Sequence, residues 1–311
     1  MKPLVIYHFP CIDGFAAALA AWCHFRDEAT YVPVNYGSAT DTAALVERCR
    51  GRDVIMLDFS LSIDDMCFIH NTSNSLIWLD HHKTAFPAAG QIWSKGRRYE
   101  RKADSLTIIL DDNKSGAMLA WEYFHPNIPI GVKHIDDHDR WVFNLPNTRA
   151  YTARLRQVPW DFEQWRHLFA KQERLNKGLL EYEPTQHYAN FVKEGEVILN
   201  AQARMLDDAL KRAKRRILIT GHDAKGNALK VQGLAANLPR AFASEAGHIL
   251  AGECGTFGLV WFIDERGMAC CSIRSKGEYD VSEIAKAFGG GGHRNAAGFE
   301  VPMARLLIWL A

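Results

Sequence analysis

Three of the four apolar runs near the N-terminus end in side chains that can bind a metal ion. His8 and Asp13 follow the first run, Asp58 closes VIMLD, and Asp80, His81 and His82 close LIWLDHH. A single aspartate after a strand usually caps a helix or turns the chain, and a single histidine is usually a surface or core group. Three adjacent polar residues at the end of one apolar strand do not improve its packing, so together they indicate a functional site.

The residue types in this set suit a transition metal. Mixed aspartate and histidine ligands without paired thiolates favour Mn²⁺, Fe²⁺ or Zn²⁺ over Ca²⁺, and one carboxylate can bridge two ions. Two ions roughly 4 Å apart can activate water and bind a phosphate group. The set therefore predicts hydrolysis of a phosphate ester.

The elements that must position these residues alternate along the first third of the chain. Strands are expected at 4–9, 31–36, 54–59 and 75–82, and helices at 16–25, 42–49 and 63–70. This alternation predicts an α/β fold with a parallel sheet covered by helices on both faces. Ligands of such sheets bind outside the carboxyl ends of the strands, so the polar groups should converge on one crevice.

The rest of the chain predicts two further regions. Helical patterns at 115–124 and 132–141 are separated by Pro126 and Pro129, and a long polar helix at 187–216 ends in KRAKRR. Beyond it, four strand patterns and helices at 242–252 and 281–288 indicate a smaller α/β or α+β unit. We expect a catalytic domain at 1–144, a helical linker at 145–216 and a second domain at 217–311.

Composition excludes several classes of protein. A chain of 311 residues with 48% hydrophobic residues can bury a sizeable core, which excludes a disordered or fibrous protein. Its 37 Lys and Arg nearly balance 36 Asp and Glu, so it lacks the global basic field of a general duplex binder. The apolar runs are too short for a membrane span, and seven cysteines without a CxxC pair favour a reducing cytoplasm.

A run of four glycines before a histidine marks the C-terminal unit. Bare glycines let backbone N–H groups approach an anion closely, and nearby histidine and arginine side chains can add charged hydrogen bonds. One glycine would be read as a helix cap, but four before His-Arg favour binding of a phosphate or a nucleotide terminus. The candidate residues are Arg274, Gly290, Gly291, Gly292, His293 and Arg294.

These segments resemble a known family. HFPCIDGFAAALA, VIMLDFS, DHH and DDHD are similar to the four motifs of the DHH phosphoesterase superfamily, and RSKGEYDVSEIAKAFGGGGHRNAAGF resembles its C-terminal DHHA1 substrate-binding domain. The family includes oligoribonucleases that also cleave phosphoadenosine phosphate, hydrolases of cyclic-dinucleotide products, single-strand exonucleases and polyphosphatases. The resemblance covers both ends of the chain and leaves the middle unassigned.

The resemblance implies a role for each N-terminal residue. His8 and Asp58 would bind one metal ion, and Asp13, Asp58, His81 and an acid of the fourth motif would bind the other, with Asp58 bridging. Asp80 would orient an imidazole, and His82 would face a substrate phosphate. In the fourth motif we favour Asp137, and Asp136 and Asp139 are close rivals because the sequence alone does not fix the helix phase. Two Mn²⁺ ions are the expected cofactors.

Cys11 departs from the family pattern, because many relatives have an aspartate at this position. The thiol could be a small filler that leaves one metal site weak. Alternatively, a thiolate ligand replaces the carboxylate and shifts the preference toward Zn²⁺ or Fe²⁺.

The expected function is a cytoplasmic metal-dependent phosphodiesterase acting on a small nucleotide or a short single-stranded oligonucleotide. Near-neutral charge favours a small substrate over a long polymer. No membrane partner is expected, and a homodimer is one assembly that the sequence allows. A polyphosphate or phosphate-anhydride hydrolase remains an alternative, as does a catalytically weakened nucleotide-binding module.

Overall fold

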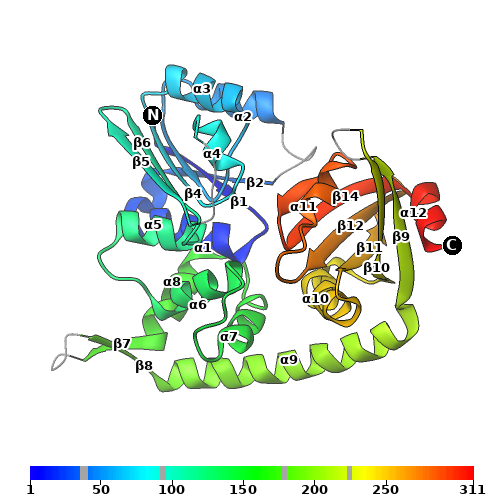
Figure 1. Cartoon of the computed structure of the whole chain (residues 1–311). Helices are drawn as coiled ribbons and strands as arrows, with labels where there is room; N and C mark the ends of the chain where they lie inside the picture. Colours follow the sequence, from blue (N-terminus) through cyan, green and yellow to red (C-terminus); the bar gives the residue numbers. More distant parts are fainter. Residues whose placement is uncertain (36–40, 92–95, 177–180, 223–225) are drawn as a thin grey trace. The chain divides into compact units, whose positions relative to one another are not determined.

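The computed structural model describes residues 1–35, 41–91, 96–176, 181–222 and 226–311. The chain divides into two compact units, Met1–Leu199 and Asn200–Ala311 (Figure 1). Among the described residues, none of the helices is long and apolar enough to cross a membrane.

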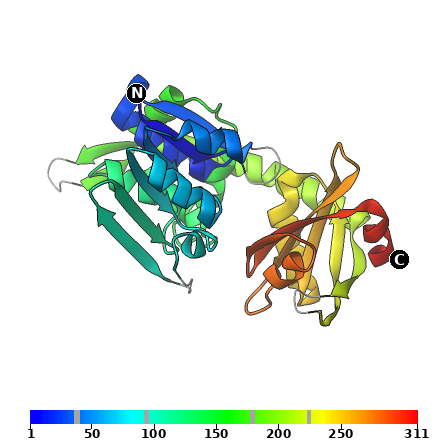
Figure 2. The same cartoon turned by 90° about the horizontal axis from the view of Figure 1, so that it is seen from above.

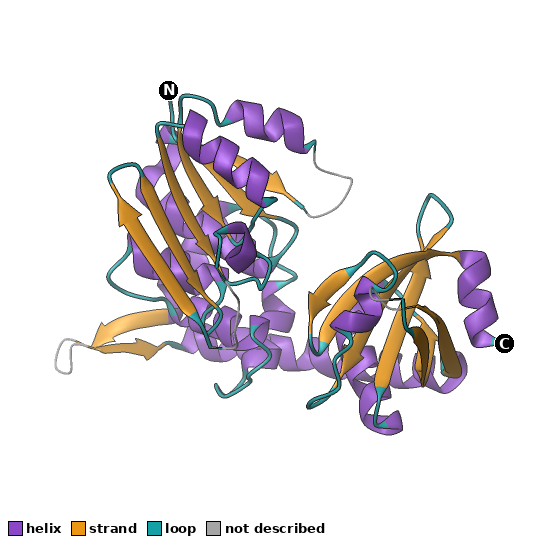
Figure 3. Ribbon diagram, turned by 45° about the horizontal axis from the view of Figure 1, so that its top comes forward, coloured by secondary structure: helices purple, strands orange, loops and turns teal. Residues whose placement is uncertain are grey.

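The first unit is built on a six-stranded sheet, and this confirms the predicted α/β class (Figure 3). Its strand order is β2-β1-β3-β4-β6-β5. The strands are β1 (Leu4–His8), β2 (Thr30–Val34), β3 (Asp53–Leu57), β4 (Ser75–Asp80), β5 (Arg98–Ala103) and β6 (Leu106–Asp111). All neighbours pair in parallel except β5, which pairs antiparallel with β6 at the sheet edge. This edge hairpin was not predicted, because RYERKA is almost wholly charged or exposed.

Helices cover both faces of this sheet (Figure 1). They are α1 (Ile12–Phe25), α2 (Thr42–Arg48), α3 (Ile63–Thr72), α4 (Ala85–Ala88), α5 (Gly116–Phe124), α6 (Ile130–Asp139), α7 (Thr148–Leu155) and α8 (Phe162–Gln172), with a short 3₁₀ helix η1 (Arg26–Glu28). Successive side chains of a strand point to opposite faces, so Val5 packs with α1 and α5 while Leu4 packs with α2 and α3. Helix α1 begins at Ile12, four residues earlier than expected, and therefore starts directly after Cys11.

Residues 145–199 pack with the first unit and do not form a separate linker. They contain α7, α8, the hairpin β7 (Glu173–Asn176) and β8 (Glu181–Pro184), and the first half of α9 (Gln186–Ala213). Tyr151 and Trp165 are fully buried in the same core as the sheet, although Trp160 is 40% exposed. The boundary between the two units therefore falls inside α9, which differs from the boundaries expected at 144 and 216.

The second unit is a mixed sheet with the order β13-β14-β12-β11-β10-β9 (Figure 2). Its strands are β9 (Arg215–His222), β10 (Ala228–Asn237), β11 (Phe257–Ile263), β12 (Met268–Ser275), β13 (Gly291–His293) and β14 (Ala296–Pro302). Its helices are η2 (Arg240–Phe242), α10 (Ala243–Cys254), α11 (Ser282–Lys286) and α12 (Met303–Leu310). Leu250 of α10 joins one apolar cluster, while Ile284 of α11 and Trp309 of α12 join another.

Candidate metal centre

The histidines and aspartates at the ends of β1, β3 and β4 converge at one edge of the first sheet. Asp58 follows β3 and has a φ of +53°, a left-handed conformation that non-glycine residues rarely adopt. Its backbone N–H donates to the carbonyl of Leu79 at 2.9 Å, which ties the turn to β4. The fold thus holds the backbone of Asp58 in an unfavourable conformation, as is typical of a functional site.

Asp58 lies between two histidines with its side chain almost fully buried. Its Oδ2 is 3.4 Å from Nδ1 of His8, and its Oδ1 is 3.1 Å from Nε2 of His81. The two oxygens of one carboxylate therefore face different imidazoles. This is the arrangement that the family resemblance implied for a bridging ligand.

Two sets of potential metal ligands surround this carboxylate. Ligand atoms of His8, Cys11 and Asp58 lie within 4.8 Å of one another, and so do those of Asp13, His81 and Asp139. In the second set, Nε2 of His81 is 3.7 Å from Oδ2 of Asp13 and 3.5 Å from Oδ2 of Asp139. Among the described residues, each set could hold one divalent cation.

Asp139, and not Asp137, is the fourth-motif acid that reaches the cluster. The carboxylate of Asp137 accepts hydrogen bonds from the N–H groups of Asn144 and Leu145, at 2.7 and 3.1 Å, and from the Thr148 hydroxyl at 2.6 Å. Asp137 therefore stabilises the backbone of the loop that follows α6. The preference for Asp137 needs correction, because the helix phase turns this side chain away from His81.

Asp136, the other rival, is also engaged elsewhere. It accepts a hydrogen bond from the N–H of Ser115 at 2.7 Å and forms an ion pair with Arg140 at 2.9 Å. These contacts join the C-terminal part of α6 to the N-terminus of α5. Asp136 thus supports the position of both helices beside the cluster.

Asp80 orients His82, as the resemblance implied. Its Oδ1 lies 2.7 Å from Nδ1 of His82 and accepts the backbone N–H of His81 at 2.7 Å. The Ser60 hydroxyl donates to the other oxygen of Asp80, and Nε1 of Trp78 donates to Ser60 at 3.1 Å. Ser60 was missed from the sequence, where a serine after VIMLDF looks like an ordinary turn residue.

The N-terminus of α5 forms another part of the site that sequence reasoning missed. The N–H groups of Gly116 and Ala117 donate to the two oxygens of Asp13 at 2.8 and 2.9 Å. A Cβ atom at Gly116 would stand 2.4 Å from Cβ of Asp58, so glycine is required for this close approach. The signal in the sequence is a glycine directly after the capping Ser115.

The electrostatics of the cluster suit divalent cations. Burial, together with the charges of Asp58 and Asp139, raises the pKa of Asp13 well above its ordinary value. Burial also raises the pKa of Asp139. Burial alone would raise the pKa of Asp58, but hydrogen bonds from His8 and His81 hold it well below its usual range. Three carboxylates so close together repel one another, and bound cations would offset that repulsion.

Cys11 lies in the same electrostatic environment. It is the N-cap residue of α1, in an extended conformation, and its side chain makes no capping hydrogen bond. Burial raises the pKa of the Cys11 thiol, and the charges of Asp58, Asp139 and Asp13 raise it further. The thiol is therefore neutral unless a cation takes the place of its proton.

The glycine segment of the second unit has a structural explanation at two positions. Gly291–His293 form β13 and pair with β14. A Cβ atom at Gly290 would stand 2.1 Å from the carbonyl oxygen of Gly298, and one at Gly292 would stand 2.5 Å from that of Ala296. Close strand packing therefore requires these two glycines, and phosphate binding by the segment stays a prediction.

The two arginines predicted to bind phosphate have partners within their own unit. Arg274 donates to the carbonyl of Ile273 at 3.0 Å and to the Ser244 hydroxyl at 3.1 Å, and burial lowers its pKa. Arg294 forms an ion pair with Glu278, whose side chain is 93% exposed. Arg274 therefore has a structural role, while Arg294 remains accessible.

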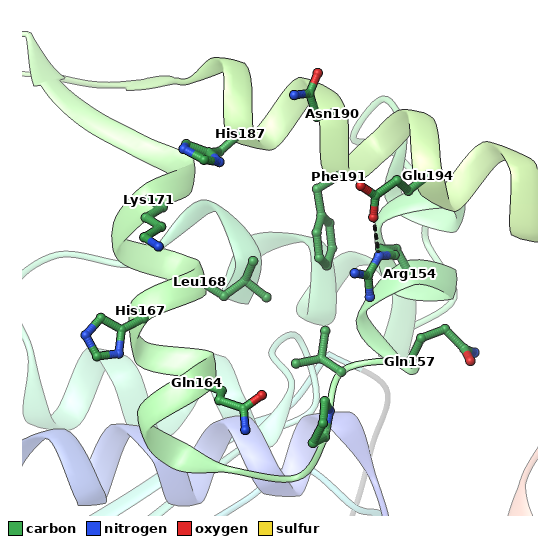
Figure 4. A pocket seen from close by; sticks show the side chains of 12 residues that line it. Arg154, Gln157, Gln164, His167, Leu168, Lys171, His187, Asn190, Phe191 and Glu194 are labelled. Carbon is green, nitrogen blue, oxygen red and sulfur yellow. Dashed lines mark hydrogen bonds and ion pairs between the residues drawn. The ribbon is translucent and has the colours of Figure 1, made fainter.

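A groove in the first unit has a volume of about 540 Å³ and lies among α7, α8 and α9 (Figure 4). Lys171, His167 and His187 lie along it, with Leu168 and Phe191 between the helices. None of its lining residues belongs to the two ligand sets. The clustering of buried ligands, more than the size of a cavity, identifies the candidate metal centre.

The fold and this site define a class of protein: a parallel α/β unit with an Asp and His cluster at its strand ends, followed by a smaller mixed-sheet unit. Residues 223–307 match the model of the DHHA1 domain. This match supports the resemblance of the C-terminal motif to the DHHA1 domain.

Two known proteins are similar over most of the chain. The uncharacterized protein R106 of Acanthamoeba polyphaga mimivirus is 31% identical over 314 residues, which cover 95% of this chain. This chain spans 66% of the length of that relative. A solved structure of PggH, a pGpG-specific phosphodiesterase from Vibrio cholerae, aligns with 97% of this chain and 93% of its own, at 9% identity and a TM-score of 0.41.

Proposed function

We propose that this chain is a divalent-metal-dependent phosphodiesterase that hydrolyses a small nucleotide or a short single-stranded oligonucleotide. The observation that carries the proposal is the buried Asp58 carboxylate, whose two oxygens face His8 and His81. A carboxylate in this position suits two neighbouring ions. The match of residues 223–307 to the DHHA1 domain supports the reaction class.

The protein side chains would hold the ions in two sets. His8 and Asp58 would hold one, and Asp13, Asp58, His81 and Asp139 would hold the other. When bound, two divalent ions supply an acidified water and neutralise charge on the phosphate. We expect Mn²⁺ in the second set, which offers only oxygen and nitrogen donors.

His82 would bind the phosphate that is being cleaved. Its Nδ1 is held by Asp80 at 2.7 Å, which fixes the orientation of the ring, and Nε2 would face the substrate. Burial alone would lower the pKa of His82, but the Asp80 carboxylate raises it overall. A protonated His82 could donate to a phosphate oxygen and neutralise the negative charge that develops there.

The size of the substrate is inferred from charge. The chain carries a formal net charge of +1, whereas proteins that track long single strands usually have a strongly basic groove. Arg294 and the glycine segment of the DHHA1 domain would bind a terminal phosphate or sugar. A substrate with few phosphates suits this limited set of contacts.

The proposal is tested by measuring hydrolysis of a dinucleotide, a longer oligonucleotide and inorganic polyphosphate by the Mn²⁺-loaded protein. We expect the dinucleotide to be cleaved fastest. Asp58→Asn should abolish this activity, while Asp53→Asn, at the exposed start of the same strand, should retain it. Faster hydrolysis of polyphosphate would favour an anhydride hydrolase, and metal binding without any turnover would indicate a binding module.

A further inference from the structure

Cys11 occupies the short connection between two elements that build the candidate metal centre. β1 ends at His8, and α1 begins at Ile12. The usual function of a polar residue at this position is to cap the helix, but the Cys11 side chain makes no capping hydrogen bond. Its Sγ instead lies within 4.8 Å of ligand atoms of both His8 and Asp58.

The other cysteines of the described chain have different surroundings. Cys49 donates to the carbonyl of Leu45 at 3.4 Å, which is a local contact inside a helix. Cys270 lies near Asp264 and Glu300, but Arg266 pairs with both carboxylates at 2.6 and 2.7 Å. A cation there would have to displace an arginine, whereas Asp58 in the Cys11 set pairs with the imidazoles of His8, His81 and His82.

From this geometry we propose that the Cys11 thiolate is a metal ligand, which makes the His8, Cys11 and Asp58 set selective for a thiophilic ion such as Zn²⁺, Fe²⁺ or Co²⁺ over Mn²⁺. The inference rests on the proposed metal centre and adds the chemical identity of one of its ions. Binding replaces the thiol proton by the cation, so one proton is released and no electron is transferred.

The two ligand sets then differ in metal preference. Asp13, His81, Asp139 and the shared Asp58 offer oxygen and nitrogen, which suit Mn²⁺, while sulfur shifts the first set toward softer ions. The protein would therefore bind two different metals when both kinds are supplied. Without a sulfur ligand, both sets would follow the same general order of metal affinity and would not differ from each other in this way.

Titration of the metal-free protein with Co²⁺ alone tests the inference, because a thiolate bound to Co²⁺ gives a charge-transfer band in the near ultraviolet. We expect the band to saturate at one equivalent. Cys11→Ser should lose it, and Cys23→Ser, a half-buried position in the helix that follows Cys11, should retain it. If Co²⁺ binds without the band, the role of Cys11 is wrong and the metal centre stands; if Co²⁺ does not bind, both proposals fail.

Metal selectivity gives a second readout that is independent of turnover. After dialysis against equal Zn²⁺ and Mn²⁺, Cys11→Asp should lower the ratio of bound Zn²⁺ to Mn²⁺ by about 10–100-fold, as changes around a metal typically do. An unchanged ratio would contradict the inference.

A measurement on the unaltered chain covers the case in which the variants do not fold. Zn²⁺ should slow alkylation of Cys11 by iodoacetamide, followed by mass spectrometry, about tenfold or more, because a bound thiolate is not free to attack. The exposed Cys67 is the internal control and should react equally with and without Zn²⁺. Equal rates at Cys11 would overturn the proposal.

Discussion

Asp58 and His81 come from the ends of adjacent parallel strands, and Oδ1 of Asp58 lies 3.1 Å from Nε2 of His81. The contact places a buried carboxylate and an imidazole where both can bind one cation. The second oxygen of Asp58 faces His8, which comes from the strand on the other side of β3. The order of three neighbouring strands thus creates a bridging position.

Asp58→Asn should lower kcat by roughly a thousandfold or more, because an amide cannot replace the charge that a bridging carboxylate supplies. The metal content measured by elemental analysis should fall with it. Thermal unfolding of the metal-free variant checks that the protein remains folded. Near-normal turnover in metal-loaded Asp58→Asn would show that this residue does not bridge.

Asp139 and Asp137 form a matched pair for separating metal binding from folding. Asp139→Asn should weaken metal binding and leave the fold intact, because its carboxylate faces His81. Asp137→Asn should lower the free energy of unfolding by about 1–3 kcal/mol, since the amide keeps only one of the two oxygens that accept hydrogen bonds from Thr148 and from two backbone N–H groups. Isothermal metal titration and denaturant unfolding of both variants would reveal a reversed pattern if the assignment were wrong.

The sequence was sufficient to predict that the histidines and aspartates converge, because three of the four apolar runs terminate in such groups and parallel strands bring those ends together. Asp139 could not be chosen over Asp137 in this way. The decision depends on contacts of Asp137 with residues 144–148, which lie beyond the motif. The role of Gly116 likewise depends on a close approach to Asp58, which is 58 positions earlier in the chain.

The extent of the first unit was also beyond sequence reasoning. The apolar residues of 145–199 are interspersed with charge, so the segment resembled a linker. Tyr151, Trp165 and Phe191 nevertheless bury fully or nearly so against the sheet-covering helices. Burial of so few large side chains gives no clear periodic signal, and only tertiary packing shows where they belong.

Gly116→Ala should weaken metal binding by about 10–100-fold without removing a ligand. The added methyl group would meet Cβ of Asp58 at 2.4 Å and its Oδ1 at 2.7 Å, so the carboxylate must shift. Gly291→Ala is the control, because a Cβ there meets nothing within 4 Å. Equal metal affinity in the two variants would mean that α5 can move away without disturbing Asp58.

His134 should make the stability of the first unit depend on pH. Burial lowers its pKa from 6.5 to about 4, and its ring nitrogens lie 2.9 Å from Oγ1 of Thr148 and 2.8 Å from the Tyr188 hydroxyl. The unfolded chain therefore binds a proton that the folded chain does not, in the range between these values. Stability should be highest above pH 6.5 and fall by up to about 3 kcal/mol as the pH drops toward 4.

The contribution of His134 is isolated by comparison with His134→Gln, with both proteins unfolded by denaturant in the presence of a chelator. The difference in unfolding free energy between the two proteins should shrink as the pH falls from 6.5 to 4. A difference that stays constant over this range would show that the imidazole does not titrate on unfolding.

Arg294 offers a test of whether the DHHA1 domain binds substrate. If its guanidinium contacts a substrate phosphate, Arg294→Ala should raise KM about 10–100-fold, the loss expected for one charged hydrogen bond, while kcat and metal content stay unchanged.

Glu278→Gln is the matched control, because it breaks the Arg294 ion pair and leaves the arginine in place. A structural role for the ion pair predicts the same result from both variants. A substrate role predicts that Glu278→Gln leaves KM unchanged or lowers it, since the arginine no longer has a competing carboxylate. Steady-state kinetics on a dinucleotide decide between the two, and a KM raised equally in both variants would remove Arg294 from the binding site.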